Sequence, residues 1–600
     1  MSNPLIGLEG LPPFSKIKPE FVVPALKDGI ANCRKAIDDV LAKKSYTWDD
    51  LVLPLEEADD KLSRLFSPVS HLNSVMNNDE LREAYEQCLP LISEYSTFVG
   101  QHQGLYEAYN ALYNSDEFKT LTTAQQKSIT NALRDFKLSG IALASEDQKR
   151  YGEISARLSE LSSKFGNNVM DATLAWHKHI TDEADLAGLP ESALALAADT
   201  AKSKELDGWV FTLDFPSYLP IMTYADNREL RKETYTAFST RASDQGPNAG
   251  EFDNSEIMKE ALALRHELAQ LLGFKSYAEK SLATKMAETP EQVFSFLEDL
   301  AAKSKPQAEQ EVAELKAYAA QKHGITELEA WDFGYYGEKL KQEKYAISDE
   351  VLRPYFPANK VLSGLFETVN RLFGISVNEV TDFDTYHKDV RFFEIVDSNN
   401  TLRGRFYLDL YARDRKRGGA WMDDCMGRKV RANGELQTPV AYLVCNFNKA
   451  VGDKPALFTH NEVTTLFHEF GHGIHHMLTQ VDAAPVAGIN GVAWDAVELP
   501  SQFLENWCYE EEALSFISGH FETGEPLPKE LLDKLLAAKN YNSGMQMLRQ
   551  IEFSLFDFKI HNDYVAGEPC QIQAVLNDVR SRTSVVHAPG FNRFQHGFSH

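Results

Sequence analysis

The sequence lacks paired cysteines, an excess of positive charge and any long apolar run. Its six cysteines are scattered without a Cys-x-x-Cys pair, which favours free thiols in a reducing compartment over disulfides or a sulfur-ligated metal. There are 61 Lys and Arg against 88 Asp and Glu, for a net charge of −27. This charge argues against nucleic acid and anionic membranes as partners, since both are bound by clustered basic side chains. No apolar run approaches the roughly 20 residues that span a bilayer.

Patterns of targeting and of other enzyme classes are also missing. The first ten residues have neither a basic leader nor a long apolar core, so we expect no signal peptide and predict a cytoplasmic protein. There is no Gly-x-Ser-x-Gly elbow and no recognisable partner pattern for a cysteine, which argues against a covalent nucleophile. Glycine-rich phosphate-binding fingerprints are absent, which argues against an ATP-driven protease.

The most informative pattern that is present is His-Glu-Phe-Gly-His, from His468 to His472. On a helix, two histidines four residues apart lie about 40° apart around the axis and ~6 Å apart along it. Both imidazoles can therefore converge on one zinc ion, and Glu469 can reach a water at the metal and act as general base. The alternative is a surface helix with incidental histidines.

The residues around this motif predict a helix. Thr459 and Glu462 have the spacing of a capping box, and apolar residues follow at helical intervals: Val463, Leu466, Phe467, Phe470 and Ile474. Gly471 and Gly473 each cost about 1 kcal/mol relative to alanine in a helix. Two glycines at that cost need a structural reason, and we predict that another element closely approaches the metal face of the helix.

A catalytic zinc usually has a third protein ligand, and two residues compete for that role. His475 lies ~10 Å further along the helix than His468, too far for one ion that is held ~2 Å from each ligand. Glu498 is the better candidate, because the turn-rich residues 481–493 allow its helical stretch to fold back against the motif. His475 remains an alternate ligand or a supporting residue. Candidate partners for the zinc histidines are Asp495, Gln502 and Glu505.

The rest of the chain is mostly helical in pattern. Successive amphipathic helices are predicted from about residue 19 to 161, including 81–89, ended or kinked by Pro90, and 123–138. A short strand is expected at 209–213 and a clear helix at 256–272.

The pattern changes near residue 390. Strand-like runs at 390–396 and 404–411 flank a turn-forming segment and predict a hairpin. The charged segment 413–419 is expected to be a mobile loop. A third strand at 440–445 precedes the zinc helix, where its backbone groups could bind an extended peptide by strand addition.

At these residues the sequence resembles the thimet-type zinc metallopeptidases. The resemblance covers nearly the whole chain and its set of motifs is highly specific. The matching segments are Leu-Pro-Pro-Phe-Ser-Lys-Ile from 11, Phe-Ser-Pro-Val-Ser-His-Leu-Asn-Ser from 66, Thr-Arg-Ala-Ser-Asp-Gln-Gly-Pro-Asn-Ala-Gly from 240, Gly-Gly-Ala-Trp-Met-Asp-Asp-Cys from 418, the zinc motif, and Glu-Leu-Pro-Ser-Gln-Phe from 498.

The resemblance implies a large, mainly α, two-lobed zincin-like peptidase with a small β region beside the zinc helix. It implies His468, His472 and Glu498 as ligands of one zinc per chain, and Glu469 as the base. The zinc would lie at the floor of a deep channel that admits short peptides and excludes folded proteins. We expect a monomeric, cytoplasmic zinc endopeptidase that hydrolyses short unfolded oligopeptides, including fragments from protein or signal-peptide turnover.

We divide the chain into an N-terminal helical domain at 1–155, a connecting segment of helices and strand at 156–222, and a catalytic domain at 223–600. In the family, a glycine- and tyrosine-rich stretch follows the segment that matches 596–600, and its tyrosines hydrogen-bond the reacting carbonyl. That stretch is missing after His600, so the catalytic domain is expected to lack its C-terminal part. Losing one such donor costs about 10²–10³ in rate, so zinc binding should survive better than turnover.

His600 is itself a candidate substrate contact. Two other functions remain open. One is a zinc-holding protein that binds peptides without cleaving them. The other is a zinc aminopeptidase, although the Gly-x-Met-Glu-Asn signature of those enzymes is absent.

Overall fold

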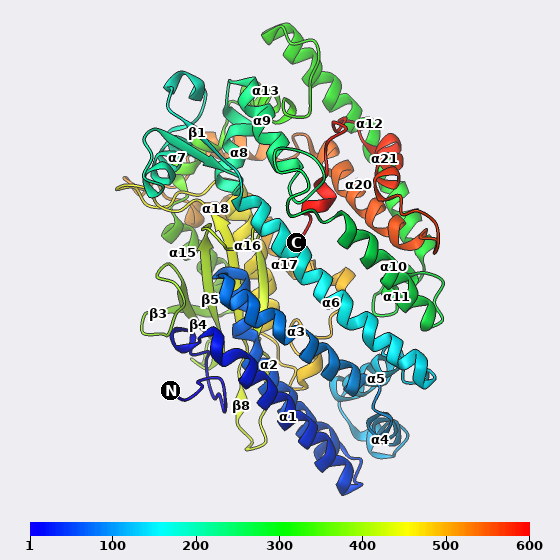
Figure 1. Cartoon of the computed structure of the whole chain (residues 1–600). Helices are drawn as coiled ribbons and strands as arrows, with labels where there is room; N and C mark the ends of the chain where they lie inside the picture. Colours follow the sequence, from blue (N-terminus) through cyan, green and yellow to red (C-terminus); the bar gives the residue numbers. More distant parts are fainter.

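The computed structural model describes residues 1–600 and is mainly α-helical with a small β region, which confirms the predicted fold class (Figure 1). No helix combines the length and the apolarity needed to cross a membrane. The helices before the main sheet are α1 Pro19–Lys43, α2 Leu53–Val75, α3 Asp79–Gly100, α4 Gln103–Tyr113, α5 Thr123–Leu138, α6 Ser145–Leu174, α7 Glu191–Ser203, α8 Phe215–Tyr224, α9 Arg228–Ser239, α10 Ser255–Leu271, α11 Tyr277–Leu282, α12 Pro290–His323, α13 Phe333–Tyr345, α14 Asp349–Leu352 and α15 Ala358–Phe373.

The first six helices confirm the predicted run of amphipathic segments. Of the two alternatives for Pro90, a helix end is wrong, because α3 continues through Pro90 to Gly100, and a kink stays a prediction. Proline removes one backbone hydrogen bond, but the helix buries Cys88 and Tyr95 on either side of it. Packing of the apolar face outweighs that local loss.

The long helix α6 connects the N-terminal helices to a second group of helices (Figure 1). It packs against α3, where Arg82 pairs with Asp171 at 2.8 Å, and against α10, where Arg157 pairs with Glu260. Residues 155 and 156 both lie inside α6. The three-part division of the chain stays a prediction.

The main sheet has five strands in the order β3-β4-β5-β9-β6. Its antiparallel β4–β5 pair confirms the predicted hairpin, and β9 pairs parallel with β5 and antiparallel with β6. A separate antiparallel pair, β1–β2, contains the strand predicted near residue 209. The strands are β1 His177–Ile180, β2 Trp209–Thr212, β3 Ser376–Val380, β4 Arg391–Val396, β5 Leu402–Tyr411, β6 Trp421–Met426, β7 Lys429–Val430, β8 Leu436–Gln437 and β9 Val440–Phe447.

The position of β9 corrects one expectation about the substrate. Because β5 and β6 occupy its two sides, β9 has no free edge, and strand addition to it is wrong. The outer strand on this side is β6, which also contacts the helix that follows β9. Any peptide that extends the sheet next to that helix must pair with β6.

The segment 413–419 is a loop, as predicted, and its contacts with β5 argue against the expected mobility. Lys416 is fully buried, and its Nζ lies 2.9 Å from Oδ1 of Asp409 and donates to the backbone oxygen of Tyr411 at 2.8 Å. Arg413 forms a two-pronged ion pair with the same carboxylate. One buried carboxylate therefore holds two cations of the loop against β5.

The helices after the sheet are α16 His460–Met477, α17 Leu499–Glu505, α18 Glu511–Ile517, α19 Lys529–Ala537, α20 Ser543–Asn562 and α21 Ile572–Thr583. Four 3₁₀ turns lie among or after them: η6 Ala484–Val486, η7 Trp494–Ala496, η8 Asn506–Tyr509 and η9 Phe594–Gly597. The largest apolar core lies where α15 and α16 pack on the sheet and α18 packs on α15. Leu443 of β9 and Phe467 of α16 both belong to it.

Candidate metal centre

Helix α16 carries the His-Glu-Phe-Gly-His motif and begins as its sequence predicts. The hydroxyl of Thr459 accepts from the backbone N–H of Glu462 at 3.1 Å, and the Glu462 carboxylate accepts from the N–H of Thr459 at 3.0 Å. The five apolar residues of the predicted stripe are all buried against the sheet and its covering helices. The opposite side of the helix is thereby turned away from the core.

Two histidines of α16 and one glutamate meet at a single point. Nε2 of His468 and Nε2 of His472 lie 3.1 Å and 3.2 Å from the same Oε2 atom of Glu498. Their side chains are 24%, 11% and 51% exposed, so the cluster is covered on the histidine side and open to solvent at the glutamate. A cluster open on one side leaves room for a water molecule or a substrate group.

The donor set of this cluster fits a zinc ion. Zinc in proteins is commonly tetrahedral with ligands at about 2.0–2.2 Å, so neighbouring ligand atoms should lie about 3.3 Å apart. The two nitrogen–oxygen distances are close to that value. Burial lowers the pKa of His472, which favours the neutral imidazole that binds metals. These three residues could hold a metal ion.

Helix α17 reaches the cluster because α16 has a glycine where the two helices meet. A Cβ atom built on Gly471 would lie 2.5 Å from the backbone oxygen of Pro500 and 2.6 Å from Cα of Ser501. This contact confirms the close approach predicted for Gly471. The Cβ of Gly473 would instead meet only side chains, with Cδ2 of Leu443 at 3.1 Å.

We expect Gly471→Ala to destabilise the fold by about 1–3 kcal/mol despite the better helix propensity of alanine, because α17 must move. Urea unfolding measures this, and zinc titration reports the displacement of Glu498. Gly473→Ala is the matched control, since flexible side chains can yield to it. Equal stability of the two variants would contradict the role assigned to Gly471.

Glu469 is buried beside the cluster. Burial raises its pKa to about 7; His468 opposes the rise, and the charges of Glu498 and Glu505 add to it. A carboxyl group with a pKa near neutrality can both accept and return a proton at physiological pH. A cation held by the cluster would lower this pKa again.

Two further residues hydrogen-bond the proposed ligands without belonging to the cluster. Oε1 of Glu505 lies 2.6 Å from Nδ1 of His468, so Nε2 of that ring is free to face Glu498. The hydroxyl of Ser501, which is fully buried, lies 2.6 Å from Oε2 of Glu498. Glu505 was among the three predicted partners. Ser501 was missed, although its place three residues after Glu498 at a helix start is a usable signal.

We expect Glu505→Ala to weaken zinc binding about 10–100-fold, because the imidazole of His468 loses the acceptor that fixes its orientation. Competition with a chromogenic chelator measures the change. Gln502→Ala is a suitable control, since Gln502 is exposed on the same helix and its side chain makes no hydrogen bond. An unchanged affinity in Glu505→Ala would remove this contact from the metal centre.

The other candidate residues lie elsewhere. His475 is not part of the cluster. Asp495 accepts hydrogen bonds from the backbone N–H groups of Met286 and Ala287, at distances from 2.9 Å, and contacts neither histidine. His600 lies within electrostatic reach of Glu498 and His468, next to Gly419.

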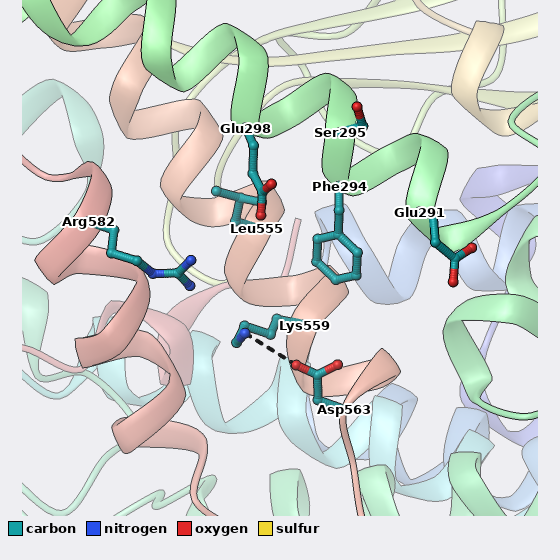
Figure 2. A pocket seen from close by; sticks show the side chains of 8 residues that line it. All are labelled: Glu291, Phe294, Ser295, Glu298, Leu555, Lys559, Asp563 and Arg582. Carbon is teal, nitrogen blue, oxygen red and sulfur yellow. Dashed lines mark ion pairs between the residues drawn. The ribbon is translucent and has the colours of Figure 1, made fainter.

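A separate surface cavity of about 450 Å³ lies between α12, α20 and α21 (Figure 2). It is lined by Glu291, Phe294, Ser295, Glu298, Leu555, Lys559, Asp563 and Arg582. Lys559 and Asp563 pair across 3.3 Å within it. The lining includes no histidine, no cysteine and none of the cluster residues, so this cavity is not the candidate metal centre.

Comparison with known proteins places these residues in a recognised family. Residues 221–600 match the description Peptidase family M3, and residues 26–149 match the N-terminal domain of neurolysin and thimet oligopeptidase. The chain is 62% identical to oligopeptidase A of Salmonella typhimurium and of Escherichia coli, with all of this chain and 88% of each relative aligned. An organellar oligopeptidase A of Arabidopsis thaliana is 40% identical over all of this chain and 77% of its own length. The resemblance noted from the sequence is confirmed.

A solved structure shares the fold at low sequence identity. PZ peptidase A matches with a TM-score of 0.56 and 15% identity over 98% of this chain and 85% of that protein. This likeness supports the same mainly helical architecture.

Proposed function

The chain belongs to peptidase family M3 and is an oligopeptide-cleaving metallopeptidase, and on that premise we propose that it is a zinc-dependent endopeptidase of the cytoplasm. Its proposed ligands are His468, His472 and Glu498, and its proposed base is Glu469. The observation that carries this proposal is the meeting of three ligand atoms at one point, with a buried carboxyl group on the next residue of the same helix.

The proposed reaction is hydrolysis of an internal peptide bond. When bound, zinc would acidify water and polarise the scissile carbonyl group. The carboxylate of Glu469 accepts the proton of the attacking water and then delivers it to the leaving amine. Glu505 holds His468 in orientation and Ser501 holds Glu498, so the ligand atoms need little rearrangement before the reaction.

The substrate is proposed to be a short unfolded peptide in extended form. The outer strand β6 can offer its free backbone groups to such a peptide beside α16, whereas β9 cannot. The two-lobed shape, the deep channel and the monomeric state expected from the family stay predictions. Size-exclusion chromatography with light scattering tests the monomer.

Internally quenched peptides with both ends blocked test the reaction, together with zinc analysis of the purified protein. Cleavage of blocked peptides by the zinc-loaded protein supports an endopeptidase. Cleavage of free N-termini alone would favour an aminopeptidase, and binding without cleavage a peptide-binding protein. A correctly folded protein that takes up no zinc would overturn the proposal.

A further inference from the structure

The turn that precedes the proposed ligand Glu498 is held by one side chain. None of the residues of η7 is buried, so apolar packing does not fix this turn. It follows the turn-rich connection 479–493, in which Gly488 and Gly491 both have positive φ. The carboxylate of Asp495 instead ties η7 to a segment far earlier in the chain.

Asp495 accepts hydrogen bonds from two backbone N–H groups. Its Oδ1 and Oδ2 atoms lie 3.0 Å and 3.1 Å from the nitrogen of Met286, and Oδ2 lies 2.9 Å from the nitrogen of Ala287. Neither N–H group donates to a backbone oxygen. Although burial opposes the change, these hydrogen bonds lower the pKa of Asp495, so its carboxylate is charged at neutral pH.

The segment 283–289, which donates these hydrogen bonds, belongs to a different group of helices from the metal ligands. It joins α11 to α12, and these two helices pack against each other and against α20 (Figure 1). The proposed ligands come from α16 and from the start of α17, which pack on each other. The hydrogen bonds of Asp495 are the only ones between residues 479–510 and residues 223–345.

The backbone from Asp495 to Glu498 is one continuous helical path. Val497 and Glu498 both have right-handed helical dihedral angles, and the N–H of Gln502 donates to the oxygen of Glu498 at 3.0 Å. A shift of η7 is therefore passed on to the ligand. After Glu498, the close contact with Gly471 fixes α17 on α16. Before Glu498, the contact that fixes the backbone is that of Asp495.

We propose that Asp495 is a positioning residue of the metal centre, which holds Glu498 in place through the N–H groups of Met286 and Ala287. This inference rests on the proposed metal centre and adds a support from outside the helices that supply its ligands. Displacing the start of α12 then loosens Glu498. A metal ion at the cluster in turn tightens the contact between Asp495 and the segment 283–289, because coupling between two sites is reciprocal.

The zinc affinity of three variants, measured by chelator competition, tests the proposal. Asp495→Ala should bind zinc about tenfold more weakly, because the backbone at Glu498 gains the freedom of roughly one residue. Asp495→Asn loses the charge but keeps one acceptor oxygen for the N–H groups, so it should retain most of the affinity. Asp495 is exposed, so both variants should fold. The matched control is Asp482→Ala, since Asp482 is an exposed carboxylate of the same connection that pairs with Arg428 at 2.9 Å; it should bind zinc as the wild type does.

Hydrogen exchange gives a readout that does not depend on turnover. In the wild type, saturating zinc should slow the exchange of the amide protons of Met286 and Ala287 about tenfold, the same factor by which the contact favours zinc. In Asp495→Ala, zinc should leave their exchange unchanged. If Asp495 only stabilised the start of α12, these amides would exchange faster in the variant but would not respond to zinc in the wild type, and the proposal would be overturned.

Two results of the zinc titration would also overturn the proposal. Equal affinity in Asp495→Ala and the wild type would show that the turn does not hold the ligand. Equal losses in Asp495→Ala and Asp495→Asn would assign the effect to charge alone. Either result leaves the proposed peptidase function intact, whereas wild-type protein that takes up no zinc overturns that function together with this inference.

Discussion

Glu469→Gln is expected to lower kcat about 10³-fold while the protein keeps its zinc. The amide of glutamine has nearly the shape of the carboxylate but cannot accept the proton of an attacking water. A positioned general base contributes a factor of about 10²–10⁴ to the rate. Because Glu469 is buried and has no substitute nearby, the rate loss on removing its carboxylate should fall within that range. Because Glu469 is not in the ligand cluster, metal content should change little.

Steady-state cleavage of a blocked quenched peptide and metal analysis of the same sample measure the two effects together. Glu462→Gln is a useful control on the same helix, because Glu462 caps the first turn and lies outside the cluster. It should lower stability more than it lowers kcat. Near-normal rates in Glu469→Gln would show that another group serves as base.

The parts of the site that the sequence predicts are those fixed within one helix. Histidine spacing, the Thr459–Glu462 cap and the apolar stripe are all local properties of α16, and the structure has each of them. Even the contact at Gly471 leaves a local trace, since a glycine in a helix requires a reason. The third ligand is predicted from the turn-rich connection at 481–493, which lets Glu498 fold back against the motif.

The parts that the sequence did not predict depend on pairing between distant segments. Nothing in residues 440–447 shows that β5 and β6 both pair with them, so their sequence predicts a strand with a free edge. The charged segment 413–419 resembles a solvated loop, because its carboxylate partner Asp409 belongs to the preceding strand.

The assignment of the third ligand gives the other large expected effect. Glu498→Ala should weaken zinc binding about 10²–10³-fold, whereas His475→Ala should leave it nearly unchanged. The expected size follows from the ~10–16 kcal/mol with which four ligands bind structural zinc, or roughly 2.5–4 kcal/mol each. Oε2 of Glu498 faces both histidine nitrogens at 3.1–3.2 Å, and His475 is outside the cluster.

Zinc affinity of the two variants is compared by chelator competition, beside Ser501→Ala. Within the cluster the hydroxyl of Ser501 hydrogen-bonds only Glu498, so removing it should cost about 10–100-fold, between the other two values. The expected loss of zinc affinity is therefore largest for Glu498→Ala, smaller for Ser501→Ala and smallest for His475→Ala. This order follows because Glu498 is the ligand and the hydroxyl of Ser501 only holds it in place. Full zinc occupancy in Glu498→Ala together with loss in His475→Ala would reverse the assignment, and α16 would then have to bend to bring its third histidine to the ion.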